Sequence, residues 1–174
     1  VKAADIILKE GIADLILLGN EEKIKALAVG LDISAAKIID PVKADNLQEF
    51  ADSFYEMRKA KGMTPEKALE TVQNVLYYGV MMVKHGLADG MVAGAVNSTG
   101  NVLRPCLQIL KTAPGTKLVS AFFVMVVPNC EYGHNGTFIF ADSGLEQNPD
   151  PEKLAAIAAS SAESFKFLVH TEPK

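Results

Sequence analysis

The sequence has little that suits a membrane or a nucleic acid. No uninterrupted apolar stretch reaches the about 18 residues that a membrane-spanning helix needs, so we expect no membrane span. The net charge is −4, and no block of lysine and arginine stands out. This balance argues against nucleic acid and anionic membrane as partners. An anionic ligand would therefore be held by a few individually placed cations.

Cysteine is also scarce, and common nucleotide-binding motifs are missing. Two cysteines, Cys106 and Cys130, are too few for a disulfide scaffold in a chain of 174 residues. Reduced thiols in a cytoplasmic protein are the simplest interpretation, and the first residues show no signal-peptide pattern. No glycine-rich dinucleotide fingerprint follows a predicted strand, and no P-loop motif occurs, so these two functions lack support.

Apolar blocks of two periods alternate along the chain. Helical periodicity covers residues 1–10, 20–31, 46–61, 64–85, 102–111 and 150–169, and short apolar runs predict strands at 14–18, 37–39, 91–95, 118–127 and 137–140. Such alternation predicts an α/β fold, with a mainly parallel sheet covered by helices. The break at Ala113-Pro114-Gly115 predicts a first α/β domain over 1–115 and the beginning of a second over 116–174. The chain opens in helical periodicity and closes directly after a long helix, so we expect a piece of a longer protein.

Residues 88–105 read as a strand, a hydroxyl-rich loop and the start of a helix. Ser98, Thr99 and Asn101 offer neutral hydrogen-bond donors, and Arg104 adds a charged fork that matches phosphate. Arg104 lies in the first turn of the helix predicted over 102–111, where a cation opposes the helix dipole unless an anion lies between them. Ser, Thr and Asn are also ordinary helix caps, and Arg104 could be solvated. Phosphate binding and simple capping both stay open on these residues.

The same segment resembles phosphate acetyltransferases. The resemblance rests on Ala88-Asp89-Gly90, Ser98-Thr99, Asn101-Val102-Leu103-Arg104-Pro105 and Leu107-Gln108-Ile109-Leu110-Lys111-Thr112. It continues through Leu118 to Phe123, Asn129 to Gly133, Phe140 to Gly144 and Asn148-Pro149. It covers essentially the whole chain and is dense from residue 88 to residue 165.

The resemblance implies a two-domain fold of the isocitrate/isopropylmalate-dehydrogenase type, here with its first strand missing and its second domain incomplete. It further implies a cytoplasmic homodimer that exchanges acetyl groups between coenzyme A and inorganic phosphate. Acetyl-CoA is then a substrate, with no permanently bound cofactor and no metal.

The resemblance also implies roles for particular residues. The arginines that hold substrate or coenzyme A anions in the family match Arg58 and Arg104. From its position alone, Arg58 is an ordinary cation near the end of a helix. The family's catalytic serine–arginine pair and aspartate base match nothing in these 174 residues, so we expect no catalytic group in this piece and no activity from it alone.

Two further residues are weaker candidates. Cys130 lies four residues before His134 in a predicted loop, but no third or fourth metal ligand is evident, and a structural thiol is the simpler interpretation. Asp142 follows a strand and either orients substrate or forms an Asx-turn, with the turn slightly favoured. The resemblance places both near the family's cleft. Cys106 is expected in the core.

Three alternatives to acetyl transfer remain. A butyryltransferase would use the same chemistry. A domain of the same family that only senses acetyl-CoA and oligomerises would bind without catalysis. A decarboxylating dehydrogenase of the same broad fold would need a cluster of metal-binding aspartates, and the sequence has none.

Overall fold

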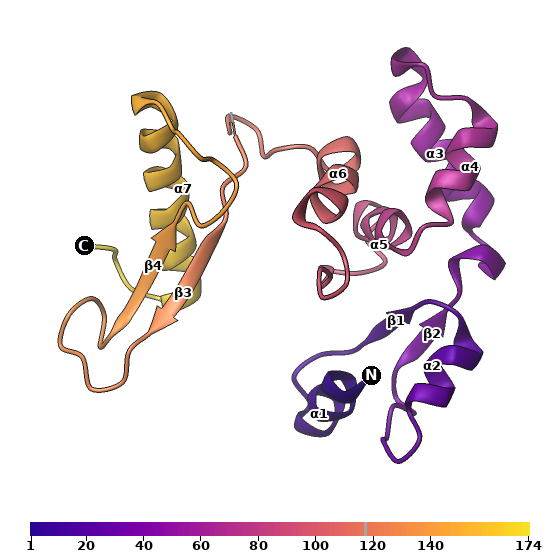
Figure 1. Cartoon of the computed structure of the whole chain (residues 1–174), viewed down its shortest axis with the longest axis horizontal. Coiled ribbons are helices and arrows are strands. Elements are labelled where there is room, and N and C mark those ends of the chain that lie inside the picture. The colour runs from indigo at the N-terminus through magenta and orange to yellow at the C-terminus, as the bar shows by residue number, and fades with distance from the viewer. Residues whose placement is uncertain (117) are drawn as a thin grey trace. The chain divides into compact units, whose positions relative to one another are not determined.

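The computed structural model describes residues 1–116 and 118–174, which divide into two compact units, 1–111 and 112–174 (Figure 1). The first unit contains α1 (Lys2–Glu10), β1 (Ile16–Leu18), α2 (Glu21–Leu27), β2 (Lys37–Ile39), α3 (Leu47–Arg58), α4 (Pro65–Val72), α5 (Val75–Lys84) and α6 (Thr99–Ile109). The second contains β3 (Phe122–Val126), β4 (Thr137–Ala141) and α7 (Pro151–Val169). The predicted α/β class is confirmed. Within the described residues, no helix combines the length and apolarity needed to cross a membrane.

The core of the first unit is formed by the packed helices α3, α4, α5 and α6. On α3 the predicted stripe points inward: Phe50 and Phe54 are fully buried, and Leu47 and Met57 pack partly against the same cluster. Residues three and four apart share one face of a helix, which is why this spacing forms a continuous apolar surface. Gly62 follows in the left-handed conformation, as predicted for a residue that ends this helical stretch.

The predicted helix over 64–85 is in fact two helices. Thr64 caps α4 as expected, since its side chain accepts from the backbone N–H of Lys67. The helix stops at Val72, however, and Asn74 starts α5 by accepting from the N–H of Leu76 at 2.9 Å. Asn favours the N-cap over the helix interior because its short amide can bond the free N–H groups of a new helix.

β1 and β2 pair in parallel, with Leu17 opposite Ile38. The strand predicted at 91–95 does not form. Gly94 has a φ of 124°, outside the β region, and Val92 and Val96 are fully exposed. Within this segment, only Met91 packs against the rest of the unit. Its sulfur would lie 2.6 Å from a Cβ on Gly79 of α5, so Met91 fits there because glycine has no side chain.

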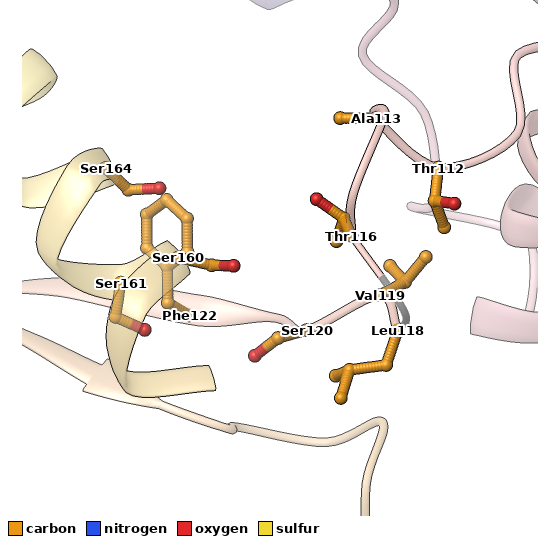
Figure 2. Close-up of a pocket in the computed structure, with 10 residues that line it drawn as sticks. All are labelled: Thr112, Ala113, Thr116, Leu118, Val119, Ser120, Phe122, Ser160, Ser161 and Ser164. Atoms are coloured by element: carbon orange, nitrogen blue, oxygen red, sulfur yellow. The ribbon is translucent and has the colours of Figure 1, made fainter. Parts of the chain in front are cut away.

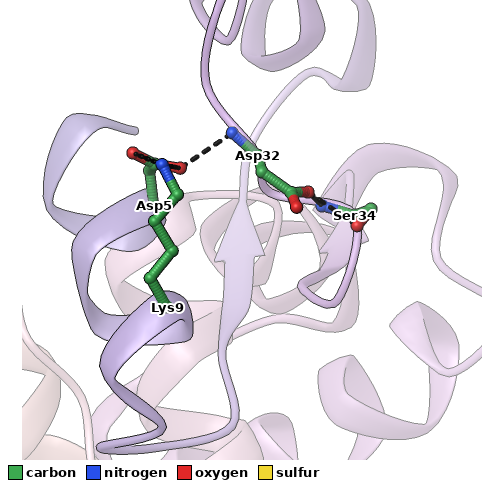
Figure 3. Close-up of polar contacts among 4 residues, drawn as sticks. All are labelled: Asp5, Lys9, Asp32 and Ser34. Atoms are coloured by element: carbon green, nitrogen blue, oxygen red, sulfur yellow. Dashed lines mark hydrogen bonds and ion pairs between the residues drawn. The ribbon is translucent and has the colours of Figure 1, made fainter.

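A hydrogen bond to the Asp5 carboxylate ties α1 to the segment after α2. Asp5, the one charged side chain among the buried residues described, accepts from the backbone N–H of Asp32 at 2.8 Å and pairs with Lys9 at 2.8 Å (Figure 3). Asp32 in turn accepts from Ser34. The hydrogen bonds from Lys9 and Asp32 lower the pKa of Asp5, so the carboxylate stays charged where it meets these donors.

In the second unit the strands are antiparallel, contrary to the parallel pairing predicted for most of the chain. Phe122 pairs with Ala141 and Val126 with Thr137. The connection over 127–136 is too short for a parallel crossover, which needs a dozen or more residues, but it suits a hairpin. The α7 helix packs on β4 and begins at the predicted cap, Asp150, which accepts from the N–H of Lys153.

Both faces of β3 are open to solvent, with Phe123 and Val126 more than half exposed. Along the chain, the boundary between the two compact units falls between residues 111 and 112. The assignment of 1–115 and 116–174 as domains of a larger dehydrogenase-type fold stays a prediction.

The hairpin loop depends on one glycine. Gly136 has a φ of 81°, and a Cβ there would lie 2.1 Å from the carbonyl oxygen of Val127. Gly115 has the same φ, but no described atom lies within 4 Å of its Cβ position. We expect Gly115→Ala to cost about 1–2 kcal/mol through backbone strain alone, and Gly136→Ala about 2–5 kcal/mol because a backbone clash adds to that strain. Urea unfolding of the two variants measures the difference, and equal losses would contradict the clash.

Candidate anion site

The two predicted arginines come together around one tyrosine. Arg58 ends α3, Arg104 lies on α6, and the charges of both act on Tyr77 of α5. Burial raises the pKa of Tyr77, and the guanidinium charges of Arg104 and Arg58 oppose that rise. The chain has 17 lysines and arginines, and these two are its only arginines. Their convergence on one phenol is therefore a specific feature of the fold.

Helical spacing explains how each arginine reaches this place. The Phe54 ring meets the Tyr77 ring edge-on, with centroids 5.5 Å apart, and Arg58 lies one turn after Phe54 on the same face of α3. On α6, Gln108 accepts a hydrogen bond from the Tyr77 hydroxyl at 3.1 Å, and Arg104 lies one turn before it. Tyr77 thus contacts one neighbour of each arginine.

Neither guanidinium has an acidic partner in the described part of the chain. The Nε atom of Arg58 is buried and has no hydrogen-bond partner. Arg104 is exposed, and no described carboxylate lies within ion-pair distance of it. Buried donors in proteins are nearly always satisfied by an acceptor, so Arg58 Nε is a candidate to bind one.

The loop before α6 differs from the sequence prediction. The helix begins at Thr99, three residues earlier than expected, because the Ser98 hydroxyl caps it by accepting from the N–H of Asn101 at 3.3 Å. Arg104 therefore lies in the second turn, not the first, and Pro105 lies inside the helix. A helix dipole acts mainly within its first turn, so the dipole argument for an anion beside Arg104 is lost.

The hydroxyl and amide candidates have mixed outcomes. Ser98 acts as a cap, the simpler of its two interpretations, while Thr99 and Asn101 are exposed in the first turn. Sequence reasoning missed Tyr77 and Gln108. The spacing of Arg104 and Gln108, four residues apart on a helix, could have pointed to Gln108, but nothing in the sequence places Tyr77 beside them.

Asp142 in the second unit forms the predicted turn. Its Oδ1 accepts from the N–H groups of Gly144 at 2.7 Å and Leu145 at 2.8 Å, and its Oδ2 accepts from Ala121 at 3.2 Å. Partial burial works to raise the pKa of Asp142, but these backbone donors outweigh it and lower the pKa to about 2. Any role of Asp142 toward substrate stays a prediction.

The two cysteines occupy different environments. Cys106 packs against the core of the first unit, as expected, and burial raises the pKa of its thiol. Cys130 lies half-buried in the hairpin loop, with no disulfide. Within the described residues, no group of three or more His, Cys, Asp or Glu side chains is placed to hold a metal.

Two cavities have no arginine among their described lining residues. One of about 220 Å³ in the second unit is bordered by Ser160, Ser161 and Ser164 of α7 and by Ser120, and none of its described lining residues is charged (Figure 2). The other, about 470 Å³ beside β2, is lined by both acidic and basic residues, among them Asp40, Asp45 and Lys43. Neither concentrates positive charge, so the surroundings of Tyr77 remain the better anion site.

Comparison with known proteins identifies the family of the chain. A family model described as "Phosphate acetyl/butaryl transferase" matches residues 1–174, the whole chain. The chain belongs to this family. The phosphate acetyltransferase of Acetivibrio thermocellus is 61% identical over 174 residues, which are 100% of this chain and 52% of that protein. That of Thermoanaerobacterium thermosaccharolyticum is 56% identical over 174 residues, again 100% of this chain, and 53% of that protein.

A solved structure of this family supports the same assignment. The phosphotransacetylase from Streptococcus pyogenes matches with a TM-score of 0.86 and 38% identity, covering 95% of this chain and 49% of that one. The chain thus spans about half the length of the phosphate acetyl/butaryl transferase relatives that it matches. Membership of the family argues against the dehydrogenase alternative.

The Asx-turn generates a pH-dependent prediction. The folded pKa of Asp142 lies near 2, below the ordinary 3.8, so its stabilising effect is present above pH 4 and is lost as the pH falls from about 4 to 2. We expect Asp142→Asn to lower the melting temperature at pH 7 and to flatten its decline in this window. Glu163→Gln, at an exposed position of α7, removes one charge outside the turn and should keep the wild-type decline. A shallower decline for Asp142→Asn than for the wild type between pH 4 and 2 would be confirmation, and an equally steep decline in both proteins would contradict the turn's role.

Proposed function

We propose that the full-length protein is a phosphate acetyltransferase, which reversibly moves an acetyl group between acetyl-CoA and inorganic phosphate. The observation that carries this proposal is the 61% identity, over every residue of this chain, to a protein named phosphate acetyltransferase. The pair of arginines without acidic partners around Tyr77 supports it, because every substrate of this reaction carries phosphate.

The reaction needs only a few groups. The coenzyme A thiolate attacks the acetyl carbonyl of acetyl phosphate, the new carbon–sulfur bond forms, and the carbon–oxygen bond to phosphate breaks as phosphate leaves. A protein must hold the phosphate, stabilise the developing oxyanion and take the thiol proton. We propose that Arg58 and Arg104 hold substrate phosphate or coenzyme A, assisted by Thr99, Asn101 and the exposed Ser98 cap. Coenzyme A is a substrate in this scheme, and no permanently bound cofactor is proposed.

The remaining roles rest on the resemblance. We propose that the catalytic serine, arginine and aspartate belong to the part of the protein outside these 174 residues, and that the protein works as a cytoplasmic homodimer. Cys130 and Asp142 remain proposed cleft residues without an assigned step. Butyryl transfer is the second candidate, favoured by the family description, which names both acyl groups. Acetyl phosphate and butyryl phosphate compared as substrates decide between the two.

The division of roles predicts the activity of the isolated chain. Residues 1–174 alone should form no acetyl-CoA from acetyl phosphate and coenzyme A, while the full-length protein should form it readily. Thioester absorbance measures both, with a mock purification as the background control. Turnover by the isolated chain above that background would place the catalytic groups within it and overturn the division.

Arg104 is the sharpest test of the anion site. It is exposed in the second turn of α6, so we expect Arg104→Ala in the full-length protein to change stability by less than about 0.5 kcal/mol. Loss of a charge-assisted bond costs about 1.5–3 kcal/mol of binding, so the KM for acetyl phosphate or coenzyme A should rise about tenfold or more. Arg104→Lys should restore part of the affinity, since it keeps the charge but loses the fork.

Lys67→Ala is the matched control for that experiment. Lys67 is an exposed cation on α4, and its truncation removes one positive charge away from Tyr77. It should leave the KM unchanged. If Arg104→Ala behaves like Lys67→Ala in the kinetics, or if its melting temperature collapses instead, Arg104 does not hold substrate.

A further inference from the structure

Tyr77 and Tyr78 are consecutive on α5 but face different surroundings. Tyr78 is buried, packs against Phe50 and donates its hydroxyl proton to Asn46. Tyr77 is only half-buried and donates to Gln108, on the face of α6 that carries Arg104. Both hydroxyls could serve the structure alone, because each hydrogen bond ties α5 to a neighbouring segment. Only Tyr77 lies among cations.

The Tyr77 hydroxyl donates its proton to the Gln108 carbonyl oxygen 3.1 Å away. The amide oxygen is therefore engaged with Tyr77, while the NH₂ group of the same amide keeps its two N–H donors. Gln108 follows Arg104 by four residues, so the two side chains share one face of α6.

The result is a group of donors without acceptors. No described residue accepts a hydrogen bond from the Gln108 NH₂ group. The buried Nε of Arg58 also lacks a partner, and no described carboxylate pairs with Arg104. One oxyanion could accept from these donors together, including the buried Nε of Arg58 that no described group satisfies.

We propose that Tyr77 is a positioning residue: its hydrogen bond holds the Gln108 amide so that the NH₂ group joins Arg58 and Arg104 in binding the phosphate group of the substrate. The identity of that substrate rests on the proposed function, but the recognition of phosphate does not. Gln108 is then a third contact to the anion, and Tyr77 acts through it.

Gln108→Glu separates this role from a structural one. A glutamate at position 108 still offers an oxygen to the Tyr77 hydroxyl, so the tie between α5 and α6 is kept. The variant replaces the two N–H donors by a negative charge that repels phosphate. In the full-length protein we expect an unchanged or raised melting temperature and affinity for inorganic phosphate, measured by calorimetry, reduced more than tenfold.

Tyr77→Phe, Gln108→Leu and the double variant test the coupling. Each single variant should raise the KM for acetyl phosphate and the Kd for inorganic phosphate about three- to tenfold, as expected for one hydrogen bond, with kcat changed less than twofold. The double variant should be no worse than Gln108→Leu alone, because the two residues act as one unit. Tyr78→Phe, which removes the neighbouring hydroxyl, should lower the melting temperature and leave both constants unchanged.

Three results would overturn the inference. Tyr77→Phe could lower only the melting temperature, as Tyr78→Phe does. Gln108→Glu could bind phosphate normally. The wild-type protein could fail to bind phosphate at all. Failure of the wild type to transfer acetyl groups while it still binds phosphate would sink the proposed reaction and leave the role of Tyr77 standing.

Discussion

The edge-to-face contact between Phe54 and Tyr77 fixes α5 against α3, and the positions of both arginines depend on it. An arginine has a long, flexible side chain, and it binds an anion well only when its helix is held still. Arg58 is one turn from Phe54, and Arg104 is one turn from the residue that Tyr77 contacts on α6. The packing of these helices thus lets the charges of two cations from distant parts of the sequence act on the same tyrosine.

The sequence predicted helix ends correctly where they depend only on residues that are neighbours along the chain. Thr64, Asp150 and Gly62 end or begin helices as predicted, because a cap needs only its own first turn. At Ser98 the polar neighbours Asn97 and Thr99 were equally plausible caps, and at Asn74 the apolar periodicity continues through the break between α4 and α5. The strand predicted at 91–95 failed because pairing needs a neighbour, which sequence periodicity does not supply.

The site was predictable only in part, for the same reason. Resemblance pointed to Arg58 and Arg104, but their common environment comes from the packing of three helices, which no local pattern encodes. The hydroxyls of the loop were natural candidates for phosphate, yet Ser98 caps a helix and Asp142 closes a turn. A polar side chain already engaged by the backbone is a weak candidate for a ligand, because releasing it forfeits a hydrogen bond.

Charged side chains that have partners within the protein differ in this respect from the two arginines beside Tyr77. The carboxylates of Asp5 and Asp142 each meet donors within their own unit, and their lowered pKa values reflect it. The guanidiniums beside Tyr77 meet no carboxylate among the described residues. Folding alone gives no reason to bring like charges together, since their repulsion opposes it. An anion between the guanidiniums would offset that repulsion, and this is the physical argument behind the proposed phosphate site.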